Sequence, residues 1–165
     1  MAHVTFKGNP FNTSGALPAV GSQIPAFALV KTDLGEITQA DIAGKCAVLN
    51  IFPSLDTPTC AVSVRTFNAK ASQAKGAKVL CISKDLPFAA SRFCAAEGLQ
   101  DVIPASAFRS EAFGKDFGVT LTDGPLKGLL ARAVIVVDPA GKVMHSQLVS
   151  EIANEPDYEA ALKSL

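Results

Sequence analysis

The chain has 165 residues, 48% hydrophobic and 18% charged, with fifteen basic residues balancing fifteen acidic ones. This length can bury a core without disulfide or metal staples, so we expect one globular domain over residues 1–165. The neutral balance and the absence of a Lys or Arg cluster argue against a nucleic-acid partner. No apolar run approaches the roughly 20 residues that span a bilayer, and the start lacks a secretion signal. We therefore expect a cytoplasmic protein without membrane contact.

The first half of the chain predicts a β-hairpin and then a buried strand. Residues 4–7 are typical of a strand that enters a turn at 8–10, and residues 11–14 can return as its partner. After a Gly/Pro-rich stretch at 15–25, residues 46–52 are nearly continuously apolar, as in a parallel strand covered on both faces. This strand ends at Pro53.

Two strand and helix signals follow in alternation. Thr57 can cap a helix that has Pro58 at its first position and ends at Gly76. One face of that helix is predicted to carry Val62, Phe67 and Ala71. Residues 78–83 form a second buried strand, and the next helix is expected to begin at residues 85–87 and end near Gly98. The result is a βαβα sequence.

The last third predicts a short helix, a hairpin and a closing helix. The short helix spans residues 110–117 and has Gly118 as its stop, and residues 133–145 are typical of a β-hairpin. The closing helix is expected to start near Asn154, which has capping-box spacing to Asp157. Alternating βα units followed by a hairpin predict an α/β fold with a central mixed sheet.

Chemistry is concentrated where the strand at 46–52 passes into the following helix. Cys60 would be about the third residue of that helix, where unpaired backbone N–H groups and the helix dipole favour an anion. Cys60 is thus positioned to be a thiolate, the nucleophilic form of cysteine. Thr57 lies three residues earlier, and its hydroxyl can both donate and accept hydrogen bonds.

Arg132 is the candidate for a positive charge near this thiol. It stands in an otherwise apolar stretch, residues 129–137. A buried guanidinium needs an anionic partner, and a thiolate would serve. Two alternatives remain open from the sequence: Arg132 reaches water at a strand end, or it pairs with a carboxylate.

The segment from Pro53 to Cys60 reads Pro-x-x-x-Thr-x-x-Cys and matches the peroxiredoxin signature P-x-x-x-T/S-x-x-C. Together with Ser-Arg-Phe-Cys at 91–94, Ala-Arg-Ala at 131–133 and the N-terminal hairpin, it makes the chain resemble the bacterial thiol peroxidases of that family. The resemblance implies a thioredoxin-like fold, a three-layer sandwich with a central mixed sheet. It also implies an antioxidant enzyme that reduces hydroperoxides without a cofactor, takes electrons from thioredoxin and forms a homodimer.

The same resemblance implies a role for each site residue. Cys60 would be the peroxidatic cysteine, with Thr57, Arg132 and Pro53 shaping its pocket. Cys94 would be the resolving cysteine that forms a disulfide with Cys60. Two cysteines can join only when their Cα atoms come within roughly 7 Å, so we expect local unfolding of both helices to bring them together. An alternative is that Cys94 is simply a small buried apolar residue.

The remaining cysteines and histidines give no comparable signal. Cys81 interrupts a buried strand, where cysteine behaves as a small hydrophobic residue, and nothing convergent surrounds Cys46. The cysteine spacings and the distant pair His3 and His145 fit no zinc site, so we expect no metal.

Two other functions fit the cysteines. A thiol–disulfide oxidoreductase on the same fold would use a C-x-x-C pair, whereas Thr57 occupies the first of those positions here. A redox sensor or holdase would need only the Cys60–Cys94 pair, and sustained turnover would distinguish the enzyme from it.

Overall fold

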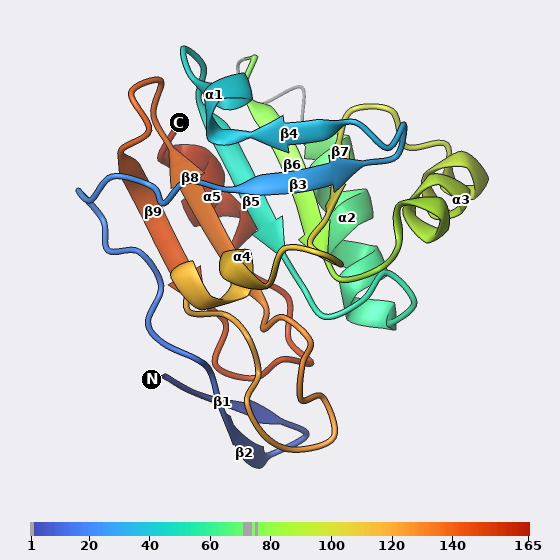
Figure 1. The fold of residues 1–165 in the computed structure, drawn as a ribbon, viewed down its shortest axis with the longest axis vertical. Helices are drawn as coiled ribbons and strands as arrows, with labels where there is room; N and C mark the ends of the chain where they lie inside the picture. Colours follow the sequence, from blue (N-terminus) through green and yellow to red (C-terminus); the bar gives the residue numbers. More distant parts are fainter. Residues whose placement is uncertain (1, 71–73, 75) are drawn as a thin grey trace.

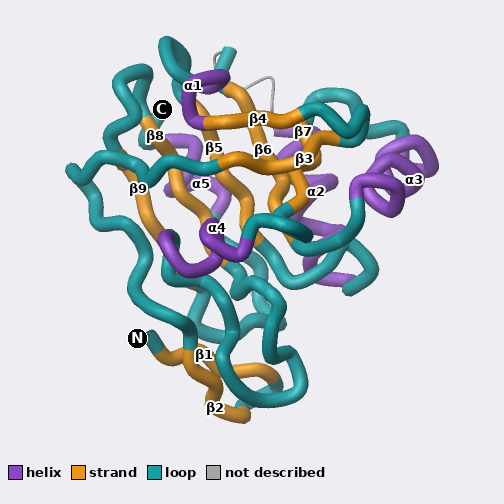
Figure 2. The backbone as a smooth tube through the Cα atoms, viewed as in Figure 1, coloured by secondary structure: helices purple, strands orange, loops and turns teal. Residues whose placement is uncertain are grey.

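A computed structural model describes residues 2–70, 74 and 76–165, and these form two β-sheets with five α-helices around them (Figures 1 and 2). The smaller sheet is the predicted N-terminal hairpin. Its strands β1 (His3–Phe6) and β2 (Asn9–Asn12) pair antiparallel across a two-residue turn. The hairpin lies beyond one end of the main sheet in Figure 1, and an isolated bridge from Thr5 to Glu151 ties it to the C-terminal part of the chain.

The main sheet has seven strands in the order β4-β3-β7-β6-β5-β8-β9. Strands β5, β6 and β7 are parallel, whereas the other neighbours pair antiparallel, so the sheet is mixed, as predicted. The strands are β3 (Ala28–Lys31), β4 (Glu36–Thr38), β5 (Ala47–Ile51), β6 (Lys78–Ser83), β7 (Ile103–Ser106), β8 (Ala133–Val137) and β9 (Val143–Leu148).

Helices cover both faces of this sheet and make a three-layer sandwich. The helices are α1 (Gln39–Ile42), α2 (Pro58–Lys70), α3 (Pro87–Glu97), α4 (Glu111–Asp116) and α5 (Tyr158–Lys163). Side chains on strands alternate between faces, and accordingly Val48 packs with residues of α2, α3 and α5, whereas Leu49 packs with residues of α4. None of the helices in the described part of the chain is long and apolar enough to cross a membrane.

Most predicted elements are confirmed, and three details are wrong. The turn of the hairpin lies at residues 7–8 instead of 8–10, so its second strand is Asn9–Asn12 and not 11–14. The closing helix begins at Tyr158, because Asp157 is its cap and accepts a hydrogen bond from the Ala160 N–H. Helix α2 buries Cys60, Val64 and Phe67, whereas Val62 is only half-buried. Ala71, predicted on the same face, lies outside the described residues. Strands β3, β4 and β7 and helix α1 were not predicted.

Helix α4 ends at Asp116 with Phe117 as its C-cap, and the predicted stop, Gly118, follows with a left-handed φ of +68°. A Cβ at this position would lie 2.3 Å from the carbonyl oxygen of Ala16, a backbone atom that cannot turn away. The left-handed conformation alone costs a non-glycine residue about 1–2 kcal/mol. We therefore expect Gly118→Ala to lower the free energy of unfolding, measured by urea denaturation, by more than about 3 kcal/mol.

Gly44 provides a matched control for this prediction. Its φ is +84°, yet nothing lies within 4 Å of an added Cβ. Gly44→Ala should therefore lower the free energy of unfolding by only about 1 kcal/mol, which is the cost of the left-handed conformation without a steric clash. Equal losses in the two variants would show that the close approach at Ala16 relaxes without cost.

The register of β5 and β8 brings the segment from Pro53 to Cys60 and Arg132 to the same end of these two strands. Ile51 at the end of β5 pairs with Ala133 at the start of β8. Pro53 and helix α2 follow the first of these positions, and Arg132 immediately precedes the second. Two segments far apart in sequence therefore meet at the carboxyl end of β5.

Candidate active site

The first turn of α2 presents Cys60 at the place that the sequence predicts. The Ala61 N–H donates to the Thr57 carbonyl at 3.0 Å, so Pro58 is the first helical residue and Cys60 the third. The Thr57 hydroxyl donates to the Ser54 carbonyl at 2.9 Å. The N–H groups of Thr59 and Cys60 lie in a helical turn where the helix supplies no carbonyl acceptor, and they can bind an anion.

The Cys60 thiol and the Arg132 guanidinium are in direct contact and fully buried. Arg132 Nη2 lies 3.2 Å from Cys60 Sγ, and their relative exposures are 1% and 0%. Arg132 Nε donates to the Ile152 carbonyl at 2.8 Å, which fixes the plane of the guanidinium. Burial excludes the alternative in which Arg132 reaches water, and none of the ion pairs found among the described residues includes it.

The third nitrogen of the Arg132 guanidinium, Nη1, is buried and makes no hydrogen bond to the described residues. A buried guanidinium is costly unless an anion faces it. The Cys60 sulfur faces Nη2, while Nη1 is left free to donate to an oxygen of a bound molecule.

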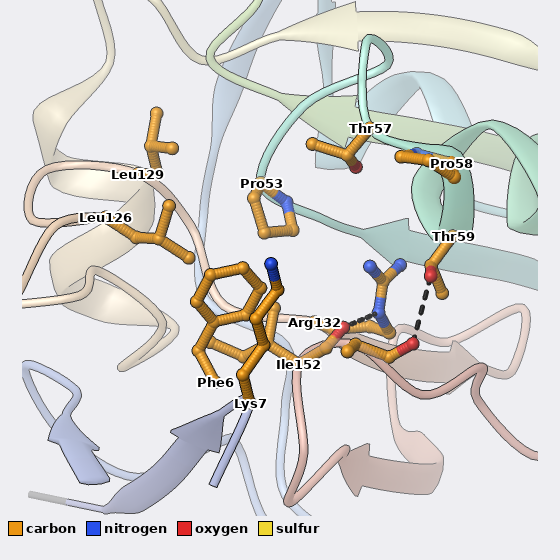
Figure 3. Close-up of a pocket in the computed structure, with 11 residues that line it drawn as sticks. Phe6, Lys7, Pro53, Thr57, Pro58, Thr59, Leu126, Leu129, Arg132 and Ile152 are labelled. Carbon is orange, nitrogen blue, oxygen red and sulfur yellow. Dashed lines mark hydrogen bonds between the residues drawn. The ribbon is translucent and has the colours of Figure 1, made fainter. Parts of the chain in front are cut away.

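Arg132 lines a pocket of about 340 Å³ (Figure 3), whereas Cys60 is buried behind it and is not one of the lining residues. Its apolar wall consists of Phe6, Pro53, Pro58, Leu126, Leu129, Ile152 and Ala153. Its polar side chains belong to Lys7, Thr57, Thr59 and Arg132. Pro53, expected from the sequence to shape the pocket, lines it, whereas the nearby apolar residues Phe52, Leu55 and Phe93 do not. Phe52 and Leu55 belong instead to the core on the face of the sheet that α2, α3 and α5 cover, and Phe93 of α3 packs against that core.

A carboxylate that sequence analysis did not assign to the site holds the loop between Pro53 and Thr57. Asp85 accepts hydrogen bonds from the Ser54 hydroxyl at 2.8 Å and from the Leu55 N–H at 2.7 Å. It accepts a third from the Ser83 hydroxyl at 2.7 Å. Its place two residues after the end of β6, a strand parallel to β5, was the available signal, since the carboxyl ends of neighbouring parallel strands meet.

A buried polar chain anchors the first turn of α2 to the sheet beneath it. The Ser63 hydroxyl donates to the Cys60 carbonyl at 2.7 Å, and Asn50 Nδ2 on β5 donates to the Ser63 hydroxyl oxygen at 3.2 Å. Any unwinding of the turn that carries Cys60 must break this chain.

All four cysteines are free thiols. Cys94 lies in the second half of α3, half-buried, and burial raises the pKa of its thiol. Cys81 is buried within β6, where desolvation raises the pKa of its thiol to about 12, so it is protonated at neutral pH. Within the residues that the structure describes, no three His, Cys, Asp or Glu side chains are grouped as metal ligands.

The chain resembles a family of redox proteins over nearly its whole length. The family model described as Redoxin matches residues 19–162. The chain is 59% identical over 165 residues to a thiol peroxidase of Mycobacterium tuberculosis, covering 100% of this chain and 99% of that protein. It is 58% identical, with the same coverage, to a thiol peroxidase of Corynebacterium glutamicum. Among solved structures, a peroxiredoxin-like protein from Aquifex aeolicus superposes with a TM-score of 0.93 at 39% identity, covering 99% of this chain and 95% of that one.

Proposed function

The chain belongs to the thiol peroxidases of the Redoxin family and reduces hydroperoxides, and we propose that Cys60 is the residue that attacks the peroxide. The observation that carries this proposal is the buried contact of 3.2 Å between Cys60 Sγ and Nη2 of Arg132, a residue that lines a mainly apolar pocket. The same contact orients Arg132, whose Nη1 is left to bind a peroxide oxygen. Thr57 and Pro53 complete the wall of the pocket around the reacting oxygens.

The proposed first step breaks the O–O bond of the substrate. The Cys60 thiolate donates an electron pair to the terminal oxygen, an S–O bond forms, and the O–O bonding pair leaves with the other oxygen. That oxygen takes up a proton to become the alcohol or water, and Cys60 becomes a sulfenic acid. Donors aimed at the departing oxygen stabilise the charge that develops on it, and Arg132 Nη1 and the N–H groups at the start of α2 are placed to do so.

The second step closes a disulfide. The Cys94 thiol attacks the sulfenic acid sulfur of Cys60, forms an S–S bond and releases water. Because Cys60 is wholly buried and Cys94 lies on another helix, both turns must unwind locally before the sulfurs meet. A dithiol protein of the thioredoxin type then reduces this disulfide by two electrons.

Further parts of the proposal concern the setting of the reaction. We propose that residues 1–165 act as one domain, that two copies form a homodimer, and that the enzyme works in the cytoplasm. The mainly apolar wall of the pocket favours an alkyl hydroperoxide over hydrogen peroxide. Equal kcat/KM values for hydrogen peroxide and cumene hydroperoxide would contradict this preference.

Cys94→Ser tests the resolving step. With thioredoxin, thioredoxin reductase and NADPH as the only source of electrons, this variant should consume about one equivalent of peroxide per chain and then stop. The reason is that the Cys60 sulfenic acid forms normally but has no thiol in the same chain to condense with. Assay of the remaining peroxide with ferrous xylenol orange measures the stoichiometry, and the NADPH absorbance at 340 nm should stay constant, because no disulfide forms for thioredoxin to reduce.

Cys46→Ser is the matched control, since Cys46 is also partly exposed but lies at the opposite end of β5 from the site. It should turn over like the unmodified chain. Continued turnover by Cys94→Ser would mean that Cys60 is resolved by another thiol. In that case mass spectrometry of the oxidised chain would identify its partner.

A further inference from the structure

The only ammonium group among the pocket-lining residues is that of Lys7, in the turn between β1 and β2. Figure 3 shows its side chain running beside the Phe6 ring toward Pro53. Its Nζ lies 5.4 Å from the centre of that ring, within cation–π range, which holds the charge against the apolar wall. The Lys7 ammonium therefore borders the space above Arg132 in which a substrate would lie.

The turn itself does not explain a lysine at this position. Lys7 has a φ of +52°, in the left-handed region, and Gly8 follows with +81°. Such two-residue hairpin turns favour Asn or Gly at both positions. A lysine is therefore a poor choice for the turn alone, and a role for its charge would account for it.

The charges around Lys7 leave it available to a bound anion. The ion pairs found among the described residues join Lys31 to Asp33, Arg65 to Glu97 and Arg92 to Asp56. The nearby carboxylate of Glu151 instead accepts hydrogen bonds from the Gly8 N–H at 2.9 Å, the Ala153 N–H at 2.8 Å and the Thr5 hydroxyl at 3.2 Å. These donors, the Ala153 N–H foremost, lower the pKa of Glu151 and hold its carboxylate at the base of the hairpin, and none of those ion pairs joins it to Lys7.

We propose that Lys7 is a specificity-determining residue that selects hydroperoxides carrying a carboxylate at the end opposite the O–O bond. This inference rests on the proposed function of Cys60. The peroxide end would lie against Cys60 and Nη1 of Arg132, the hydrocarbon body would contact Phe6, Leu126 and Leu129, and the carboxylate would meet Nζ of Lys7. The pocket thus carries two positive groups, on Arg132 and Lys7, which match a substrate that has a carboxylate as well as a peroxide group.

The test compares kcat/KM for 4-carboxycumene hydroperoxide with that for its methyl ester, which differs in charge at the far end. The unmodified chain should prefer the carboxylate about fivefold, the size expected of a partly exposed ion pair. Lys7→Gln should bring this ratio to about one, Lys7→Glu should invert it, and Lys7→Arg should retain it. Because each value is a ratio on the same variant, any general effect on activity cancels. Raised salt should also reduce the preference of the unmodified chain.

Lys142→Gln is the control for net charge. It removes the same charge, but Lys142 lies in the β8–β9 turn, at the end of the sheet away from Pro53, and it should leave the ratio unchanged. A Lys7→Gln variant that keeps the ratio of the unmodified chain would overturn the inference while leaving the peroxidase function intact. Failure of the unmodified chain to reduce even plain cumene hydroperoxide would overturn the proposed function and this inference with it.

Discussion

Replacing the Cys60 sulfur with an oxygen, as in Cys60→Ser, is expected to lower kcat/KM for hydroperoxides at least about a thousandfold. A thiolate is the nucleophile in this chemistry, whereas a serine hydroxyl is not ionised near pH 7 and has no sulfenic acid to form. Arg132 and the first turn of α2 would still bind the peroxide but could not break its O–O bond. The thioredoxin-coupled assay with hydrogen peroxide and cumene hydroperoxide measures the loss.

Two controls separate lost chemistry from lost structure. Cys46→Ser makes the same chemical change at the opposite end of β5 and should keep the activity of the unmodified chain. Circular dichroism should show that Cys60→Ser retains the α/β fold. Sustained turnover by a folded Cys60→Ser variant would show that the nucleophile is another thiol, and would favour a reassignment of the whole site.

Elements with strong local signals could be predicted from the sequence. Strands β5, β6 and β8 are buried on both faces. Their continuous apolar runs therefore predict a strand even when the strands that pair with them are not known. Helices α2 and α3 each begin with a proline, Pro58 and Pro87, and the second ends at Gly98 in a left-handed conformation. The signature from Pro53 to Cys60 lies within one such strand–helix unit, and this is why the placement of Cys60 could be predicted.

The missed elements are those whose stability depends on the neighbouring strands. Strands β3 and β4 have only four and three residues and gain their pairing from each other and from β7. Strand β7 contains Pro104, which normally argues against an inner strand. It is tolerated because β7 pairs with β3 only at Ala105 and Ser106.

The start of the last helix was misplaced for a local reason. Asn154 and Asp157 have the spacing of a capping box, but Pro156 disfavours helical conformation in Glu155, the residue before it. The helix therefore cannot include Glu155, and Asp157 becomes its cap.

Most residues of the pocket wall could not be predicted from local patterns in the sequence. Phe6 and Lys7 come from the hairpin, and Leu126 and Leu129 from a long connection before β8. The bridges from Thr5 to Glu151 and from Thr13 to Leu121 join these segments, and no spacing in the sequence encodes such pairings.

Removing the guanidinium in Arg132→Met should lower kcat/KM for hydroperoxides about 100- to 1,000-fold, the range found when one donor to a developing oxyanion is lost. Two contributions combine: the contact between Nη2 and Cys60 Sγ no longer favours the thiolate, and Nη1 no longer donates to the peroxide. The first also predicts slower alkylation of Cys60 by neutral iodoacetamide at pH 7, a reaction that does not involve the peroxide. Comparing the two losses therefore separates activation of the thiol from binding of the oxygen.

Stability distinguishes this result from misfolding. Replacing a buried charge with an apolar side chain of similar length is often neutral or stabilising, so Arg132→Met should remain folded in its reduced form. Arg132→Lys keeps the charge but replaces the planar fork with a single ammonium; it cannot serve Cys60, the Ile152 carbonyl and a peroxide oxygen in the same geometry. We expect its activity to fall between those of Arg132→Met and the unmodified chain. If Arg132→Met kept its peroxidase and alkylation rates within about threefold of the unmodified chain, the thiolate would owe its stability to the start of α2 alone, since that helix terminus is the other source of positive potential at Cys60.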